Sequence, residues 1–154
     1  CLVGSEMCIR DRILSILVLA IVAVQFAFAG DVITKDAKDL PLNARNFINQ
    51  YFSKPQISYI KIDSEFLSKK YEVTLTDRTE IDFDKKGNWT EVDCKKGAVP
   101  VALIPASIKD YVKKNFPNEI ITKIERKGTG IEVELANDFS LKFNKKGQFV
   151  SMDD

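Results

Sequence analysis

Residues 71–93 read YEVTLTDRTEIDFDKKGNWTEVD, and residues 131–153 read IEVELANDFSLKFNKKGQFVSMD. The second stretch begins sixty residues after the first, and both carry the same residue at several matched positions. The identical pairs are Glu72/Glu132, Val73/Val133, Leu75/Leu135, Phe83/Phe143, the Lys-Lys-Gly runs at 85–87 and 145–147, and Asp93/Asp153. A match of this kind indicates one structural unit built twice.

Both stretches alternate apolar and polar residues. Tyr71, Val73 and Leu75 alternate with polar neighbours, and the second stretch repeats this alternation from residue 131. A period of two with one apolar face predicts antiparallel strands that are covered on one side. The Lys-Lys-Gly runs predict hairpin turns in which glycine takes the left-handed conformation.

A helix is predicted ahead of each set of strands. Pro41 opens the apolar-striped segment 42–52, and Pro105 opens the similar segment 106–116. Proline suits the first turn of a helix, and the stripe suits one buried helix face. The β-branched segments 57–62 and 120–125 follow the helices and predict the first strand of each sheet.

The predicted fold is α+β, a tandem repeat of a helix packed on a four-stranded antiparallel meander sheet. We expect the first unit at residues 40–93, a linker at 94–103 and the second unit at 104–154. Phe83 and Phe143 should then occupy equivalent core positions beneath their helices.

The N-terminal part predicts export. Residues 1–12, CLVGSEMCIRDR, read as translated sequencing adapter, and residues 13–29 read as a signal peptide that ends in Ala-Phe-Ala. The apolar run 13–28 is shorter than the roughly 20 residues of a typical membrane span. We expect 30–39 to be an N-terminal segment of the mature protein, which would be periplasmic or secreted, without a membrane span after cleavage.

Charge and composition exclude several function classes. The 23 basic and 22 acidic residues are interspersed, so the chain has no electrostatic footprint for nucleic acid. It has no histidine, and Cys94 is the one cysteine beyond the leader. We therefore predict no catalytic residues, cofactor or metal, and no enzymatic activity. Cys94 would be a buried thiol or would pair with another chain.

The segment beginning at Asp82 has a weak likeness to a calcium-binding loop. Asp82 and Asp84 stand at the first and third positions, but Lys86 places an ammonium where an oxygen ligand belongs. We therefore interpret the segment as a hairpin.

The blocks YEVTLTD…EIDFDKKGNWTEVDCKKG.VP at 71–100 and IEVELAND…LKFNKKGQF resemble the PepSY-like, beta-lactamase-inhibitor-like family of exported bacterial proteins. The resemblance runs from about residue 40 to residue 154. It implies a tandem helix-on-sheet fold and export, but it implies no established chemistry, because a fold does not fix a function.

Two features point to a binding surface: the polar face of the sheet and the apolar pair Phe66-Leu67 in the first hairpin connection. We predict an exported, non-catalytic module that binds a protein or peptide in the cell envelope, as an inhibitor or regulator. The alternative is a carrier of a small ligand or envelope component, which would need a concave pocket. The candidate partner-binding residues are Phe66, Leu67, Glu72, Thr74, Glu80, Asp82, Glu132 and Glu134.

Overall fold

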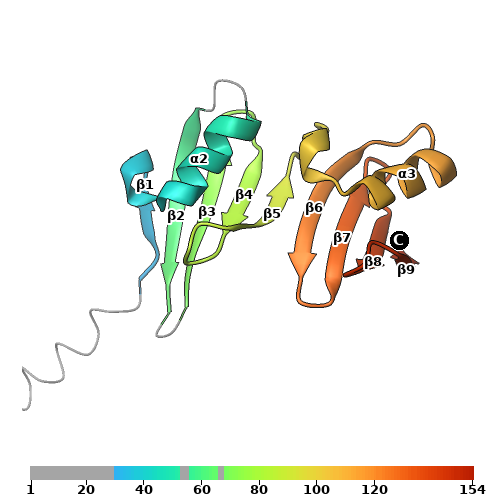
Figure 1. The fold of residues 1–154 in the computed structure, drawn as a ribbon. Coiled ribbons are helices and arrows are strands. Elements are labelled where there is room, and N and C mark those ends of the chain that lie inside the picture. Colours follow the sequence, from blue (N-terminus) through green and yellow to red (C-terminus); the bar gives the residue numbers. More distant parts are fainter. Residues whose placement is uncertain (1–29, 53–55, 66–67) are drawn as a thin grey trace, which may run out of the picture.

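The computed structural model describes residues 30–52, 56–65 and 68–154. In this part of the chain, nine strands form one antiparallel sheet in which neighbours in sequence are neighbours in space (Figure 1). The strands are β1 Val32–Thr34, β2 Ile57–Ser64, β3 Lys69–Leu75, β4 Glu80–Phe83, β5 Trp89–Asp93, β6 Ile121–Lys127, β7 Gly130–Leu135, β8 Ser140–Asn144 and β9 Phe149–Asp153.

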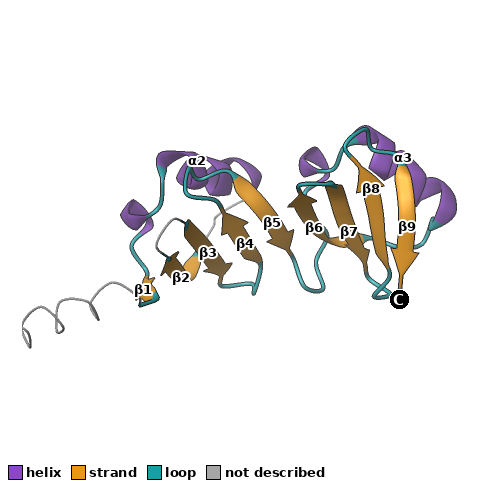
Figure 2. Ribbon diagram, turned by 90° about the horizontal axis from the view of Figure 1, so that it is seen from below, coloured by secondary structure: helices purple, strands orange, loops and turns teal. Residues whose placement is uncertain are grey.

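The helices lie on one face of this sheet, and the other face has no helix over it among the described residues (Figure 2). They are α2 Leu42–Tyr51 and α3 Ala106–Asn115, with short 3-10 helices η1 Ala37–Asp39 and η2 Val101–Leu103. Both α-helices begin directly after a proline, Pro41 or Pro105, as the sequence predicts. Their apolar stripes bury Ala44, Phe47, Ile48, Ile108 and Val112.

The predicted fold class, a tandem repeat of a helix on a four-stranded meander, is wrong. The structure is a single nine-stranded sheet with two α-helices, because β5 pairs with β6. Val92 of β5 lies opposite Ile124 of β6, and both side chains are fully buried. Two separate sheets would leave β5 and β6 as edges with unpaired backbone groups, whereas pairing satisfies them and buries this apolar contact.

Two segments outside the expected strands also belong to the sheet region. Strand β1 lies in the N-terminal segment 30–39 and pairs with β2, which was not predicted. In the segment 94–103, the backbone N–H groups of Cys94 and Val99 donate to the carbonyls of Thr122 and Ile121 at 2.8 and 2.9 Å. The Val99 side chain is buried as well, so this connection packs as part of the core.

The core lies between the helices and the sheet. The prediction that Phe83 and Phe143 are core residues is confirmed, with 1% and 3% of their surfaces exposed. The ring of Phe47 from α2 meets Phe83 edge-on at 5.6 Å, and Tyr111 from α3 meets Phe143 edge-on at 5.4 Å. These arrangements are favourable for aromatic pairs and anchor each helix to the strands beneath it.

The two Lys-Lys-Gly runs form hairpin turns, as predicted. Gly87 and Gly147 have φ angles of 80° and 73°. In the first turn, Asp84 Oδ1 accepts hydrogen bonds from the backbone N–H groups of Lys86 and Asn88 at 2.8 and 2.9 Å. The carboxylate of Asp84 is thus engaged in shaping the turn, which is the hairpin interpretation of this segment.

Candidate functional site

Charged side chains cover the sheet face opposite the helices. The strand registers place one row of them across seven strands: Lys61, Glu72, Asp82, Glu91, Glu125, Glu132 and Lys142. We call its five consecutive carboxylates, Glu72 to Glu132 in this order, the acidic row. Like charges directly opposite one another on neighbouring strands destabilise a sheet, so the row has an energetic cost.

Lysines compensate one end of the acidic row. Lys123 Nζ lies 2.7 Å from a carboxylate oxygen of Glu91. Lys127 Nζ lies 3.2 Å from Glu125 and 2.6 Å from Glu132. Among the described residues, no ion pair involves Glu72 or Asp82, although these two lie directly opposite each other.

The surroundings of Asp82 perturb its carboxylate. Its pKa is raised from 3.8 to about 6, first by burial and then by the neighbouring charges of Glu91, Glu72 and Glu80, while Lys123 acts in the opposite direction. A carboxylate that is partly buried among other negative charges is easier to protonate than a solvated one. A nearby cation also stabilises its charged form more strongly.

A second row runs beside the first. Thr74 lies opposite Glu80, and Glu80 lies opposite Asp93. Lys95 Nζ lies 2.7 Å from carboxylate oxygens of both Glu80 and Asp93, and hydrogen bonds to these two groups raise the pKa of the lysine. Thr74 is only 9% exposed, and its hydroxyl has no hydrogen-bond partner in the described part of the chain.

The predicted partner-binding residues fall into two groups. Glu72, Thr74, Glu80 and Asp82 are neighbours on β3 and β4. Glu132 and Glu134 lie on β7, with β5 and β6 in between. Phe66 and Leu67 lie outside the described residues, so their role stays a prediction.

The predicted partner-binding residues did not include the two residues that join these groups. Glu91 and Glu125 complete the acidic row between β4 and β7. Both occur in alternating strands, but their neighbourhood depends on the pairing of β5 with β6. The alternation of apolar and polar residues predicts that Glu91 and Glu125 both lie on the polar face. It does not predict that they lie opposite each other, because this depends on which strands pair.

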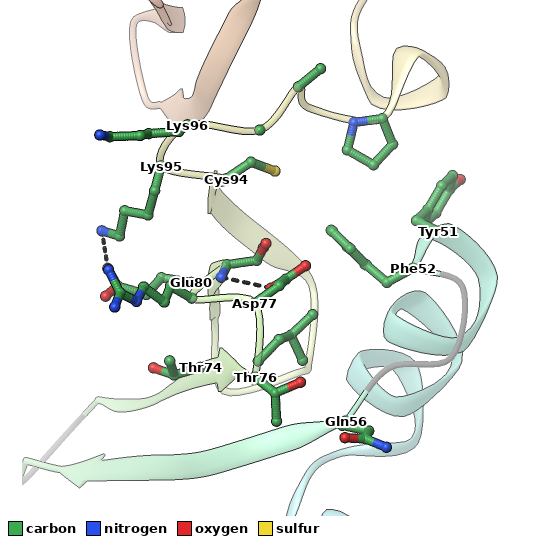
Figure 3. A pocket seen from close by; sticks show the side chains of 16 residues that line it. Tyr51, Phe52, Gln56, Thr74, Thr76, Asp77, Glu80, Cys94, Lys95 and Lys96 are labelled. Atoms are coloured by element: carbon green, nitrogen blue, oxygen red, sulfur yellow. Dashed lines mark hydrogen bonds and ion pairs between the residues drawn. The ribbon is translucent and has the colours of Figure 1, made fainter.

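A cavity of about 1030 Å³ opens at one end of the second row. Figure 3 shows Thr74, Thr76 and Glu80 on one side of it, Tyr51 and Phe52 of the α2 region on another, and Cys94 with Lys95 and Lys96 above. The cavity thus combines an aromatic wall with charged groups, and Thr74 and Glu80 of the second row line it. This combination suits a ligand that has both apolar and polar parts.

Cys94, which lines this cavity, is a poor nucleophile. Burial raises the pKa of its thiol to about 11, and the nearby carboxylates of Asp77 and Asp93 contribute, while a hydrogen bond with Thr79 opposes them. We expect Cys94 to react with iodoacetamide at about pH 7.5 about a hundredfold more slowly than an unperturbed cysteine, because so little thiolate is present.

Mass spectrometry of the peptide that contains Cys94 measures this rate. The control is the same protein unfolded in guanidinium chloride, where the rate should return to that of an ordinary thiol. Equal rates in the folded and unfolded protein would contradict the assigned burial of Cys94.

Two features are absent from the described residues, a metal-binding group of side chains and a membrane-spanning helix. Within residues 30–52, 56–65 and 68–154, no group of three or more His, Cys, Asp or Glu side chains is arranged to hold a metal ion. None of the helices that the structure describes is long and apolar enough to cross a membrane.

Comparison with known proteins places these features in context. Residues 69–151 match the family model described as "Putative beta-lactamase-inhibitor-like, PepSY-like". No curated protein is detectably similar to the chain.

Solved structures from Bacteroides are similar to the chain over most of its length. One, a "putative periplasmic protein of unknown function" from Bacteroides vulgatus, is 39% identical, with a TM-score of 0.78, covering 81% of this chain and all of the other. A "putative calcium-regulated periplasmic protein" from Bacteroides thetaiotaomicron is 44% identical, with a TM-score of 0.76, covering 80% of this chain and 97% of the other.

A third structure, from Bacteroides vulgatus, is described as a "putative periplasmic protein from DUF2874 family". It is 37% identical, with a TM-score of 0.75, covering 80% of this chain and 97% of the other. All three structures are described as periplasmic, which confirms the predicted periplasmic or secreted location.

Proposed function

The chain belongs to the PepSY-like, beta-lactamase-inhibitor-like family, and we propose that it is an exported, non-catalytic module that binds a protein or peptide partner in the cell envelope. The polar face of its sheet is the proposed binding surface, with Glu72, Thr74, Glu80, Asp82, Glu132 and Glu134 among the contact residues. A role as an inhibitor or regulator is part of this proposal.

The observation that supports the proposal most directly is the pair Glu72 and Asp82, which takes part in no ion pair among the described residues. The two carboxylates face each other across neighbouring strands, and no ion pair among the described residues neutralises them. Asp82 is also partly buried, so its charge is costly to the folded protein. Proteins retain such costs chiefly at functional sites, where a ligand relieves them.

The chemistry of the surface points to a basic partner segment. Lysine or arginine side chains placed over Glu72 and Asp82 would supply the cation that Lys123 and Lys127 supply further along the acidic row. Charge complementarity of this type mainly sets specificity and the association rate, and it weakens as salt is added.

The Asp82→Asn variant is expected to be more stable than the parent protein at about pH 7.5. The folded pKa of Asp82, about 6, lies above the value of 3.8 for the free group. The carboxyl therefore favours the folded state below about pH 4, and this contribution is lost as the pH rises through about 6. Discounted for solvent screening, the gain in the free energy of unfolding is about 1–2 kcal/mol.

Urea denaturation at several pH values measures this gain, which should disappear below about pH 4, where both proteins carry a neutral group at position 82. The matched control is Asp110→Asn, which removes an exposed charge from α3 on the opposite side of the sheet. If Asp82→Asn is less stable than the parent at about pH 7.5, the charged Asp82 side chain does not destabilise the folded protein, and the prediction is wrong.

Asp82→Asn should also bind a basic partner less well. With an oligolysine peptide as the probe at low salt, we expect the variant to bind about fivefold more weakly, or about 1 kcal/mol. Asp110→Asn should change the affinity by less than about twofold, although it has the same net charge as the first variant. Equal losses in the two variants would show that only the overall charge matters, and the proposed surface would then be wrong.

The relative described as calcium-regulated suggests one addition to this experiment. Carboxylate oxygens are the ligands that calcium prefers, and Glu72 and Asp82 present carboxylates on one surface. Peptide binding should therefore be measured with calcium and with a chelator. A calcium-dependent affinity that Asp82→Asn abolishes would support a regulated form of the same binding function.

The cavity at the end of the second row favours the alternative function, a carrier of a small ligand or envelope component. Its volume of about 1030 Å³ and its wall formed by Tyr51 and Phe52 could accommodate an apolar group, with Lys95 and Lys96 near a polar one. Native mass spectrometry of the protein recovered after export tests this alternative. A reproducible small-molecule adduct that is lost on denaturation would favour the carrier over the protein-binding module.

A further inference from the structure

Strand β9 forms one edge of the sheet (Figure 2). It exposes three apolar side chains to solvent. Phe149, Val150 and Met152 are 39%, 62% and 47% exposed. They are three of the eight large apolar side chains that are exposed among the described residues. The opposite edge, β1, is only three residues long, a length typical of edges that are protected against further pairing.

The register of β9 is the same as that of the internal strand β5. In β5, Val92 lies opposite Ile81 and Trp89 opposite Phe83; in β9, Met152 lies opposite Leu141 and Phe149 opposite Phe143. The register shifts at the equivalent place in both pairings, between Asp82 and Phe83 in β4 and between Lys142 and Phe143 in β8. The strand that pairs with the outer side of β5 therefore indicates what kind of strand could pair with the outer edge of β9.

Strand β6 covers β5 with a specific set of side chains. Ile124 lies opposite Val92, and the guanidinium of Arg126 stacks 3.7 Å from the centre of the Trp89 ring. Lys123 lies opposite Asp93 and also binds the Glu91 carboxylate. With this cover Trp89 is 8% exposed and Val92 is fully buried, whereas their counterparts in β9 are open to solvent.

We propose that the outer edge of β9 binds an extended segment of a partner protein as a tenth, antiparallel strand. The segment would carry the β6 pattern, a branched apolar residue facing Met152 with basic residues on either side. One basic side chain would lie near Asp153 and the other over the Phe149 ring, as Lys123 and Arg126 do at β5. Such strand addition combines backbone hydrogen bonds with side-chain specificity.

The charges favour this occupant over a second copy of the chain. If β1 of another copy were added with Val32 beside Met152, its Asp31 would come next to Asp153, which repels it. Pairing β9 with β9 of another copy offers no basic residue, since its sequence is FVSMD. The inference goes beyond the proposed function, because it concerns the sheet edge and does not depend on the acidic row.

A synthetic peptide with the β6 sequence ITKIERK, residues 121–127, is the probe for this experiment. We expect the exported protein to bind it with a Kd below about 100 μM, measured by fluorescence anisotropy. The Ile124→Pro version of the peptide keeps every charge but cannot join a strand ladder, so it should bind at least about tenfold more weakly. Hydrogen exchange should show new protection at residues 149–153 and none at 89–93.

Variants of the protein separate the edge from other surfaces. Met152→Lys places a positive charge at the open edge and should reduce binding at least about tenfold. Val32→Lys makes the same change on the opposite edge, at a side chain that is 55% exposed, and should leave binding intact. Asp110→Asn, which removes a negative charge from α3 on the helix side of the sheet, should also leave it intact, so an effect of overall charge is distinguishable from an effect at the edge.

Any of four results in the peptide experiments would overturn the proposal. These are no binding of the peptide, equal binding of the Ile124→Pro version, unchanged binding by Met152→Lys, and protection at 89–93 in place of 149–153. Sedimentation that shows a dimer with residues 149–153 already protected in the absence of peptide would also overturn it, because the edge would then be a contact between copies of the chain.

Discussion

Phe83→Ala is expected to lower the free energy of unfolding by about 3–5 kcal/mol, the largest loss that we predict for a single side chain. Phe83 is 1% exposed, and its ring contacts Phe47 edge-on from α2. Truncation removes buried apolar surface, leaves a cavity and takes away an aromatic pair that anchors the helix to the sheet. Denaturant unfolding with an unchanged m-value measures the loss.

The control for this variant is Val101→Ala, a truncation at a side chain that is 63% exposed, which should cost less than about 0.5 kcal/mol. Phe143→Ala should resemble Phe83→Ala, because Phe143 is 3% exposed and meets Tyr111 in the same geometry. A loss below about 1 kcal/mol for both phenylalanine variants would contradict their assignment to the core.

Gly87→Ala is expected to lower the free energy of unfolding by about 2–4 kcal/mol. Gly87 has a φ of 80°, which costs a residue with a side chain about 1–2 kcal/mol. An added Cβ would also lie 2.7 Å from Pro41 Cβ and 2.9 Å from the backbone nitrogen of Ala44, at the start of α2. Relieving this overlap would push the hairpin away from the helix, at a further cost of about 1–3 kcal/mol.

Gly128→Ala is the matched control, since a Cβ at that position has no heavy atom within 4 Å in the described structure. Thermal unfolding should shift strongly for Gly87→Ala and by only about a degree or two for Gly128→Ala. Similar shifts for both variants would show that the contact between the hairpin and α2 is not tight.

The local elements could be predicted because each depends on a pattern within a short segment. The alternation at Tyr71, Val73 and Leu75 sets one apolar face of β3, and the Lys-Lys-Gly runs place glycine where φ is positive. The stripe beginning after Pro41 gives a helix with one buried face. These patterns also identified Phe83 as a core residue, since it shares the apolar parity of its strand.

The candidate site was predictable only in part. Glu72 and Asp82 are neighbours through the β3–β4 hairpin, whose short turn brings them opposite each other. Thr74 shares their face, yet neighbouring groups bury it, and its burial does not follow from alternation. The raised pKa of Asp82 depends partly on Glu91 of β5, which the hairpin between β4 and β5 places beside it.

The sequence alone determined strands β2 to β9, the two helices, the hairpin turns and a polar sheet face without histidine, but not strand β1. The tertiary structure decided that β5 and β6 pair, which turns two expected sheets into one and completes the acidic row with Glu125. It also decided that β9, which shares the register of β5, keeps an open apolar edge. The local pattern of apolar and polar residues determines which face of a strand is buried. The connection between β5 and β6 contains a helix, so their pairing depends on which strand edges are still unpaired after the hairpins have formed.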